Sequence, residues 1–440
     1  MTRILGIEVR RSAALGTVLA LLVAGAILLY AAPQRWSAGW MALAMAQREY
    51  LVLLWPVALA AGAFQARREH RSHVAELFTS TPRPAAQRVI PVLGAMAIAV
   101  VGAYVLVAAL GVPWIIDTAG YLPARVFVVL AVGALAMIGG AWLGLAVGRL
   151  LPSMVAAPVL AVAGIGLLMV LPAGVGSREW LALIFSPMYG MGQYTDYQTV
   201  GGKVSLAQAI WLTALALAAV VLLAAGSWRT RVAALLPAAL GATLAIMIIP
   251  RDEHVANPID PVAQELVCAD GSPRVCVSRI HTGLLPEVVP PAREALNRLA
   301  KLPGAPTAVH EDTTTYHPYV VPKSRPDVVL IEVRADRTGH LAWPGRVLPE
   351  IIADAINPLN CPDGVEWAVP RAAAAFLTGE EPKPDRYAVD EPAEINAEAV
   401  KLLNGLRALP EQEALARITA VRNARLACKD VEGLLTRSAR

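Results

Sequence analysis

RREHRSHVAELFTSTPRPAAQR, residues 67–88, is a basic island between two apolar runs, and it decides how the chain is organised. Residues 50–66 before it and 89–110 after it contain no Asp, Glu, Lys or Arg, whereas the basic island holds five arginines and two histidines. A segment this polar does not lie in hydrocarbon. The two neighbouring runs therefore predict membrane-spanning helices, and the basic island predicts a connection on one side of the membrane.

On both sides of the basic island, seven apolar runs in total are long enough or nearly long enough to cross a bilayer. A spanning helix needs roughly 20 mostly apolar residues. None of the seven contains a charged residue, and they cover residues 12–32, 50–66, 89–110, 126–147, 154–171, 207–226 and 232–249. We therefore expect an all-α polytopic membrane domain over residues 1–250.

The charged residues divide the chain into two parts. Residues 1–250 carry 16 Lys/Arg and 7 Asp/Glu, whereas residues 251–440 carry 22 Lys/Arg and 27 Asp/Glu. The mean hydropathy of +0.53 comes from the aliphatic runs of the first part. The second part has an ordinary globular composition and predicts a separate domain. The net charge of +4 is a sum over two unlike parts, so it gives no indication of nucleic-acid binding.

The distribution of Lys and Arg between the runs predicts an orientation. If the N-terminus is cytoplasmic, the inner segments hold eleven basic residues; these segments are 1–11, 67–88, 148–153 and 227–231. The outer segments hold five; these are 33–49, 111–125 and 172–206. Basic residues favour the cytoplasmic side. We therefore expect a multi-pass protein of the plasma membrane with residues 251–440 outside.

All four cysteines lie in the second part of the chain, at Cys268, Cys276, Cys361 and Cys428. An even number confined to one domain predicts two disulfides and an oxidising compartment. Three pairings are possible. We favour Cys268–Cys276 with Cys361–Cys428, because the first two are near neighbours in sequence.

Strands and helices are both expected in residues 251–440, which predicts an extracytoplasmic α+β domain. Apolar and β-branched residues predict strands at 274–280 and 327–333. Helical spacing of apolar residues predicts helices at 291–302, 345–357, 393–409 and 411–427. Residues 251–265 and 380–392 are rich in proline and charge and predict linkers.

The basic island has the pattern of a helix, a sharp turn and a second helix. Val74, Leu77 and Phe78 form one apolar stripe, and Pro82 suits the first turn of the following helix. An apolar stripe flanked by charge predicts a docking face for a partner protein. The same pattern is typical of an interfacial helix held by lipid headgroups.

Two further segments of the first part have membrane-related patterns. Residues 1–12 mix apolar and basic residues, which predicts an interfacial helix or a simple basic anchor. Residues 179–189 predict a short helix at the outer membrane surface. Gly140, Gly144 and Gly148 form a stripe of small residues that allows close helix packing, either within this chain or between subunits.

Sequence motifs exclude several kinds of chemistry. The chain has no G-x-x-x-x-G-K-[ST], H-E-x-x-H or G-x-S-x-G motif, so no P-loop, zincin or α/β-hydrolase site is predicted. His310, Glu311 and His317 have poor spacing for a metal site, and we interpret them as surface polar residues on a loop. No catalytic residue, metal or cofactor is predicted, and energy for any transport has to come from a partner.

The block R-R-E-x-x-x-x-x-A-E-L-F-x-S-T-P-R, residues 67–83, resembles the permease subunit of type 2 ATP-binding-cassette exporters. Members of that family often carry a similar E-L-L-x-(S/T)-x-P segment between their first two spans, and it contacts a separate ATPase subunit. The basic N-terminus resembles the family's elbow helix, and the long outer loop before the sixth span resembles its re-entrant helices. The resemblance implies a set of coupling residues: Arg67, Arg68, Arg71, Val74, Glu76, Leu77, Phe78, Pro82 and Arg83.

The chain departs from this family by a seventh span and a second domain. Residues 275–306 resemble outer domains attached to actinobacterial permeases of this kind. The resemblance implies a permease subunit that dimerises or pairs with a similar subunit and binds a cytoplasmic ATPase. The alternatives are a membrane-anchored sensor or ligand-binding protein and a membrane-tethered hydrolase.

Overall fold

The structure is a computed structural model that describes residues 13–71, 85–315, 325–358, 367–383 and 393–436. The chain forms two compact units. The helical unit comprises residues up to Asp117 together with Leu122–Asp260, and the α/β unit comprises Thr118–Tyr121 together with residues from Pro261 onward. Each unit has its own hydrophobic core.

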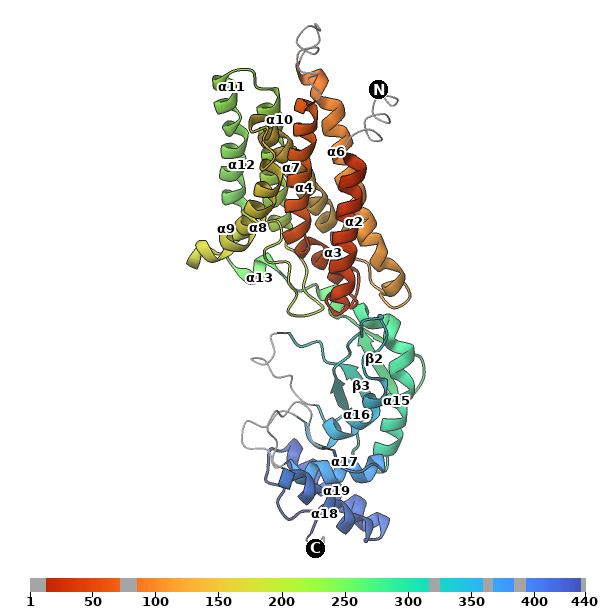
Figure 1. Ribbon diagram of the computed structural model, residues 1–440. Helices are drawn as coiled ribbons and strands as arrows, with labels where there is room; N and C mark the ends of the chain where they lie inside the picture. The colour runs from red at the N-terminus through yellow and green to blue at the C-terminus, as the bar shows by residue number, and fades with distance from the viewer. Residues whose placement is uncertain (1–12, 72–84, 316–324, 359–366, 384–392, 437–440) are drawn as a thin grey trace. The chain divides into compact units, whose positions relative to one another are not determined.

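Six helices of the helical unit are long and apolar enough to cross a membrane: Ala14–Ala31, Val89–Ile115, Arg125–Leu150, Ala156–Gly174, Gly202–Ala224 and Trp228–Ile248. Figure 1 shows them packed side by side. The elements of this unit are α2 (Ala14–Ala31), α3 (Trp40–Glu49), α4 (Leu51–Arg71), α6 (Ala85–Ile115), α7 (Arg125–Leu150), α8 (Ala156–Gly174), α9 (Trp180–Phe185), α10 (Gly202–Ala224), α11 (Trp228–Ala233), α12 (Leu235–Ile248) and α13 (Glu253–Ala256), with 3-10 turns at Pro33–Arg35 and Gly176–Arg178.

The second predicted span differs from the others. Its run, residues 50–66, falls on α4, but α4 is preceded directly by α3, and the two helices meet at an angle of 51°. This bent pair is a broken span or a re-entrant loop, and counting it as a span gives the seven that the sequence predicts. Residues 40–49 were expected in an outer loop. They form a helix whose residues Met41–Arg48 are all buried.

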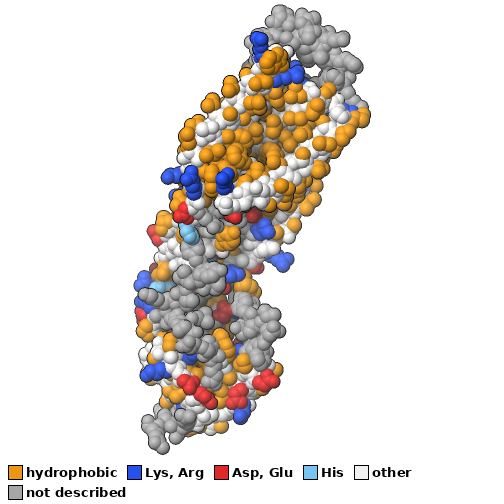
Figure 2. All heavy atoms as spheres, turned by 90° about the vertical axis from the view of Figure 1, so that its left-hand side faces the viewer, with side chains coloured by type: hydrophobic (Ala, Val, Ile, Leu, Met, Phe, Trp, Pro, Cys, Tyr) orange, Lys and Arg blue, Asp and Glu red, His pale blue; other side chains and the backbone are white. Residues whose placement is uncertain are grey.

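Large apolar side chains cover the outside of the helical unit, as Figure 2 shows for one of its faces. On α8 the exposed residues include Val159, Val162 and Val170, and on α12 they include Leu240 and Met247. A continuous exposed apolar surface is unfavourable in water but matches lipid chains. The surface therefore agrees with the length and hydropathy of the helices, and the unit is a polytopic helical domain of membrane-protein type.

A four-stranded mixed sheet organises the α/β unit. Its order is β1-β2-β3-β4, with β1 antiparallel to β2 and the other pairs parallel. One face of the sheet packs into a core with helices α15 and α16, through Val275, Val277, Val309, Val329 and Ile331. The elements are α14 (Pro261–Gln264), β1 (Leu266–Cys268), β2 (Arg274–Ser278), α15 (Leu285–Leu299), β3 (Ala308–Glu311), β4 (Val328–Ile331), α16 (Val347–Ile356), α17 (Ala368–Thr378), α18 (Ala393–Arg407) and α19 (Glu411–Leu426), with 3-10 turns at Arg279–Leu284 and Pro344–Arg346.

The expected strands and helices of this unit are present, with ends shifted by a few residues, except that α15 begins at Leu285 and not at residue 291. Strands β1 and β3 and helix α17 were not predicted. Both strands are very short, and α17 is a run of alanines with an internal Pro370. Part of the expected linker at 251–265 is also structured, because α13 and α14 bury Ala256 and Ala263.

The segment Thr118–Tyr121, between α6 and α7, belongs to the α/β unit. It lies against Gly283, where a Cβ atom would come within 2.1 Å of the carbonyl oxygen of Thr118. Only glycine allows this approach of two backbones. The α/β unit is therefore assembled from two separate stretches of the chain.

Candidate functional site

Most of the predicted coupling residues fall outside the described residues: Val74, Glu76, Leu77, Phe78, Pro82 and Arg83. Arg68 and Arg71 belong to the last turns of α4, and Arg67 is partly exposed there. Figure 1 shows the end of α4 and the start of α6 at the same end of the helical unit as α11. The α11 residues Arg229 and Arg231 are exposed. This end is therefore basic in the part of the chain that the structure describes, and the coupling role stays a prediction.

The predicted packing glycines of α7 lie against α4. A Cβ atom on Gly144 would come within 1.9 Å of the carbonyl oxygen of Leu59, and one on Gly148 within 2.6 Å of the Cα of Ala63. Gly140 lies against the indole of Trp55. The α4 helix contributes Gly62 in return, where a Cβ atom would come within 2.1 Å of the Ala141 carbonyl oxygen. The stripe thus packs within the chain, along the helix that leads into the basic island.

Arg48 is the most unusual side chain of the helical unit. It lies near the C-terminal end of α3, next to the bend between α3 and α4, and it is fully buried. Among the described residues of this unit it is the one charged side chain that is buried. A buried guanidinium requires hydrogen-bond partners, because its desolvation is costly.

The guanidinium of Arg48 finds those partners on three other segments. Its Nε donates to the carbonyl oxygen of Pro187 at 3.0 Å, and Nη2 donates to that oxygen as well. Nη1 donates to the carbonyl oxygen of Val129 on α7 at 3.3 Å, and Nη2 donates to Oε1 of Gln208 on α10 at 2.9 Å. Gln208 is itself fixed, since its Nε2 donates to the carbonyl oxygen of Leu183 on α9 at 2.7 Å. Arg48 therefore joins α3, α7, α10 and the segment after α9.

More polar atoms surround Arg48 in the same core. Tyr104 of α6 lies beside it, because a Cβ atom on Gly133 would be 2.1 Å from Tyr104 Oη and 2.8 Å from Arg48 Cδ. Gln47 Nε2 donates to the carbonyl oxygen of Tyr104 at 3.1 Å. Several buried polar atoms have no hydrogen-bond partner among the described residues: Gln47 Oε1, Tyr50 Oη, Trp55 Nε1, Tyr104 Oη and Ser186 Oγ. We call Arg48, Gln47, Tyr104 and Gln208 the polar core.

The charge and the hydrogen-bonding groups of the polar core determine which groups it can bind. All the partners of Arg48 are neutral carbonyl or amide oxygens, and none of the described carboxylates contacts it. Its positive charge is therefore not neutralised locally. A buried charge of this kind interacts favourably with an anionic or strongly polar group that enters the bundle. Within the polar core, Tyr104 Oη and Gln47 Oε1 have no partner among the described residues and add hydrogen-bonding capacity.

The sequence did not predict the polar core. Arg48 lies in the sequence QRE, residues 47–49. Three consecutive polar residues end an apolar run in any hydropathy window. Its partners are 81, 139 and 160 residues away in sequence. The run of apolar residues from Trp40 to Ala46 is the one local signal of a buried helix there, since a loop seldom holds seven such residues.

The α/β unit corrects the interpretation of His310 and Glu311 as surface residues on a loop. Both lie on β3, and Glu311 is buried. Its Oε2 accepts from the backbone N–H of Ser278 at 2.7 Å, and its Oε1 lies 2.6 Å from Nδ1 of the buried His281. His317 is outside the described residues. No metal-binding group of three His, Cys, Asp or Glu side chains occurs in the ranges that the structure describes.

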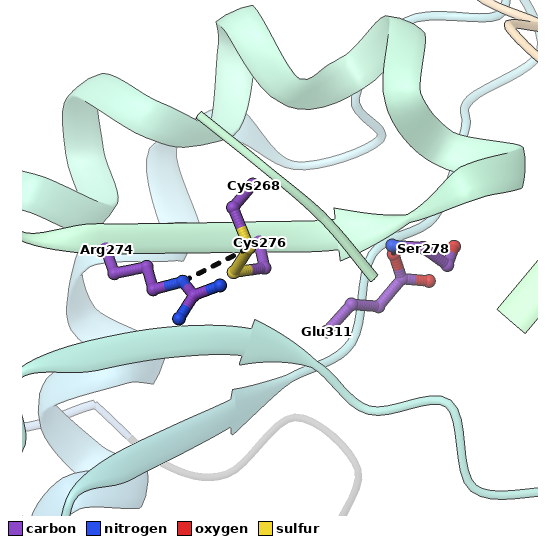
Figure 3. Close-up of a disulfide and its surroundings, with 5 residues drawn as sticks. All are labelled: Cys268, Arg274, Cys276, Ser278 and Glu311. Carbon is purple, nitrogen blue, oxygen red and sulfur yellow. Dashed lines mark hydrogen bonds between the residues drawn. A yellow bond between two sulfur atoms is a disulfide. The ribbon is translucent and has the colours of Figure 1, made fainter. Parts of the chain in front are cut away.

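The predicted disulfide between Cys268 and Cys276 is confirmed. It joins β1 to β2, as Figure 3 shows. Cys428 is disulfide-bonded as well. Its predicted partner Cys361 lies outside the described residues, so that pairing stays a prediction.

Comparisons of the chain with protein-family models, with curated proteins and with solved structures find no match.

Proposed function

We propose that the chain is the membrane-spanning permease subunit of an ATP-driven exporter of the ATP-binding-cassette type. The observation that carries the transport part is the broken helix α3–α4 with the buried Arg48 beside its break. Residues 1–250 form the permease domain, with the N-terminus in the cytoplasm. Residues 251–440 form an extracytoplasmic domain.

A broken helix in a membrane domain has a specific physical meaning. Backbone groups released at a break have no water to bind in hydrocarbon, so such breaks occur where they are buried in protein or line a cavity. In transporters, discontinuous helices build the substrate site. An ionisable residue in that setting supports a functional role over a purely structural one. The polar core at the α3–α4 bend has both features.

The energy source is a separate protein. The sequence contains no P-loop, so this chain does not bind ATP through one. The basic island, residues 67–88, resembles the ATPase-binding segment of type 2 exporters, and it connects α4 to α6. Helix α4 leads into the basic island and packs closely against the glycines of α7. A displacement of the basic island is therefore transmitted through α4 to α7. Helix α7 carries Val129, whose carbonyl oxygen accepts a hydrogen bond from Arg48. Two such permease subunits form the transporter.

Co-purification tests the coupling assignment. We would search the neighbouring genes for a P-loop ATPase, express it together with the tagged chain, and compare that chain with a variant that lacks residues 74–78. The expected result is loss of the ATPase from the deletion variant. Arg229→Gln, which removes an exposed arginine at the same end of the helical unit, serves as the control and should retain it.

The outcome also separates the permease from a membrane-anchored sensor. Retention of the ATPase after the deletion would refute the coupling role of the basic island. No ATPase bound to the unaltered chain would favour a sensor. Topology is tested by labelling Cys428 with an impermeant maleimide in intact cells after reduction. Labelling only after lysis would place residues 251–440 inside.

A further inference from the structure

The Cys268–Cys276 disulfide lies on the face of the sheet opposite the core. Successive residues of a strand point to opposite faces. Val275 and Val277 point into the hydrophobic core, so Arg274 and Cys276 point to the other face. Cys276 is aligned with Cys268 on one side and with His310 of β3 on the other. The disulfide, a guanidinium and an imidazole thus share one face.

Arg274 lies directly against the disulfide. Its Nε is 3.4 Å from Sγ of Cys268, and Figure 3 shows the side chain extending along β2 toward the two sulfur atoms. The side chain is exposed, and it makes no ion pair with a described carboxylate. An arginine with no acidic partner is available to stabilise negative charge on the sulfur.

The positive charge of Arg274 also affects His310, which is aligned with Cys276 on the neighbouring strand β3. The pKa of His310 is lowered, first by burial and then by the charges of Arg274 and Arg325, while Asp327 acts in the opposite direction. Asp327 is paired with Arg325 at 2.6 Å, so it does not neutralise Arg274. His310 Nε2 is buried and has no hydrogen-bond partner among the described residues. The charge of Arg274 therefore acts on the β3 neighbour of Cys276 as well as on Cys268, while the nearby carboxylate of Glu311 is engaged by the Ser278 N–H and His281.

We propose that Cys268–Cys276 is a reducible site of thiol–disulfide exchange with an external dithiol, and that Arg274 stabilises the thiolate of Cys268. This proposal does not depend on the permease function. The alternative is an inert staple that only holds β1 against β2. An inert staple does not require a guanidinium without a carboxylate against its sulfur, and it predicts no effect of Arg274 on the thiol chemistry.

The exchange proceeds in two balanced steps. Cys276 is fully buried and Cys268 is partly exposed, so the first thiolate of the dithiol attacks Sγ of Cys268. The bond between the two cysteines breaks, a mixed disulfide forms on Cys268, and the Cys276 sulfur leaves as a thiolate that takes up a proton. The second thiolate of the reagent then attacks the sulfur of its own mixed disulfide. Cys268 leaves as a thiolate beside Arg274, and the external dithiol ends as a disulfide.

The test measures the equilibrium between the oxidised and reduced forms in buffers of reduced and oxidised dithiothreitol. The full-length protein in detergent is quenched with acid, alkylated and analysed by peptide mass spectrometry. We compare the unaltered chain with Arg274→Gln. The control is Arg279→Gln, which removes an exposed arginine paired with Glu265 and not with sulfur. The disulfide of Cys428 is an internal reference in every sample.

A thiol next to arginine has a pKa below the usual value of about 8.5. If Arg274 favours the thiolate form of Cys268 about tenfold, Arg274→Gln decreases the equilibrium constant for reduction about threefold at pH 8 and leaves it unchanged at pH 6. Arg279→Gln and the Cys428 disulfide show no such change. This pH-dependent difference separates a thiolate effect from a loss of stability, which acts at both pH values.

Two results overturn the proposal. One is an equal equilibrium constant for Arg274→Gln and the unaltered chain at pH 8. The other is a Cys268–Cys276 disulfide that resists excess dithiothreitol while the protein stays folded. In a Cys276→Ser chain, the rate of iodoacetamide alkylation of Cys268 against pH provides a second measurement. Arg274→Gln in that background should move the midpoint to higher pH. If this chain does not fold, the equilibrium measurement decides alone.

Discussion

Gly144→Ala tests the close packing of α7 against α4. A Cβ atom at this position would lie 1.9 Å from the carbonyl oxygen of Leu59 and 2.8 Å from its carbonyl carbon. Both are backbone atoms, so no side-chain rotation relieves the clash. The two helices have to separate locally by about 1 Å before the contact becomes acceptable, and this weakens the dispersion contacts along the interface. Gly139→Ala on the same helix is the matched control, because its Cβ would meet nothing nearer than the Leu212 carbonyl oxygen at 3.6 Å.

The expected cost follows from these two contacts. Forcing an additional methyl group into a packed interior costs about 1–3 kcal/mol. Replacing glycine by alanine within a helix gains up to about 1 kcal/mol in both variants. The helix gain is the same for both variants, so Gly144→Ala should be less stable than Gly139→Ala by about 1–3 kcal/mol. For a unit of this size, that difference lowers Tm by roughly 2–12 °C.

Thermal unfolding in detergent, followed by tryptophan fluorescence, measures the difference. The chain contains ten tryptophans, and Trp55 itself packs against Gly140 on this interface. Gly139→Ala should melt at or slightly above the temperature of the unaltered chain. Equal Tm values for the two variants would refute the packing of α7 against α4 as described.

Three further predictions follow from buried polar groups. Arg48→Met keeps the side-chain volume but leaves the oxygens of Pro187 and Gln208 without a donor, so the same melting experiment should show a loss of about 1–3 kcal/mol; an unchanged Tm would contradict the polar core. Glu311→Ala removes the acceptor of the Ser278 N–H, whereas Glu311→Gln retains an oxygen there, so denaturant unfolding of the alanine variant should show it less stable by about 1–3 kcal/mol; equal stabilities would speak against this bond. Burial, with the charge of Glu350 as a second cause, raises the pKa of Asp354 from 3.8 to about 7. The folded chain therefore holds a proton that the unfolded chain releases between these values, and stability falls as pH rises through this range. Asp354→Asn should stabilise the chain on the order of 1–2 kcal/mol at pH 8 and not at pH 4; equal effects at both pH values would argue against the shift.

Spanning helices are predictable from this sequence because they depend on the summed hydropathy of neighbouring residues. Six of the expected runs coincide with long apolar helices, with differences at their ends. The α3–α4 bend is different in kind. It depends on Arg48 being held by groups of α7, α10 and the segment after α9, and a local window contains none of these. A local count therefore places Arg48 in a loop, although the fold buries it.

The same distinction applies to the sites. Gly140, Gly144 and Gly148 indicate by their spacing that some helix approaches closely, but the spacing does not say that the helix is α4. The near neighbours Cys268 and Cys276 could be paired from sequence alone. The environment of the disulfide could not be predicted from sequence. Arg274 contacts the sulfur only because of the register of β1 with β2. His310 is aligned with Cys276 from β3, a strand that was not predicted.

The α/β unit is not a cassette that can be cut at a single position of the gene. Four of its residues, Thr118–Tyr121, are encoded more than a hundred codons upstream of the rest, between the codons for α6 and α7. A fragment that starts at Pro261 would lack Thr118–Tyr121, the segment that packs on Gly283. The backbone at Gly283, which has no side chain to cover it, would then be exposed. A recombinant version of this unit therefore needs both stretches, and an exchange of the unit between related genes has to replace both stretches together.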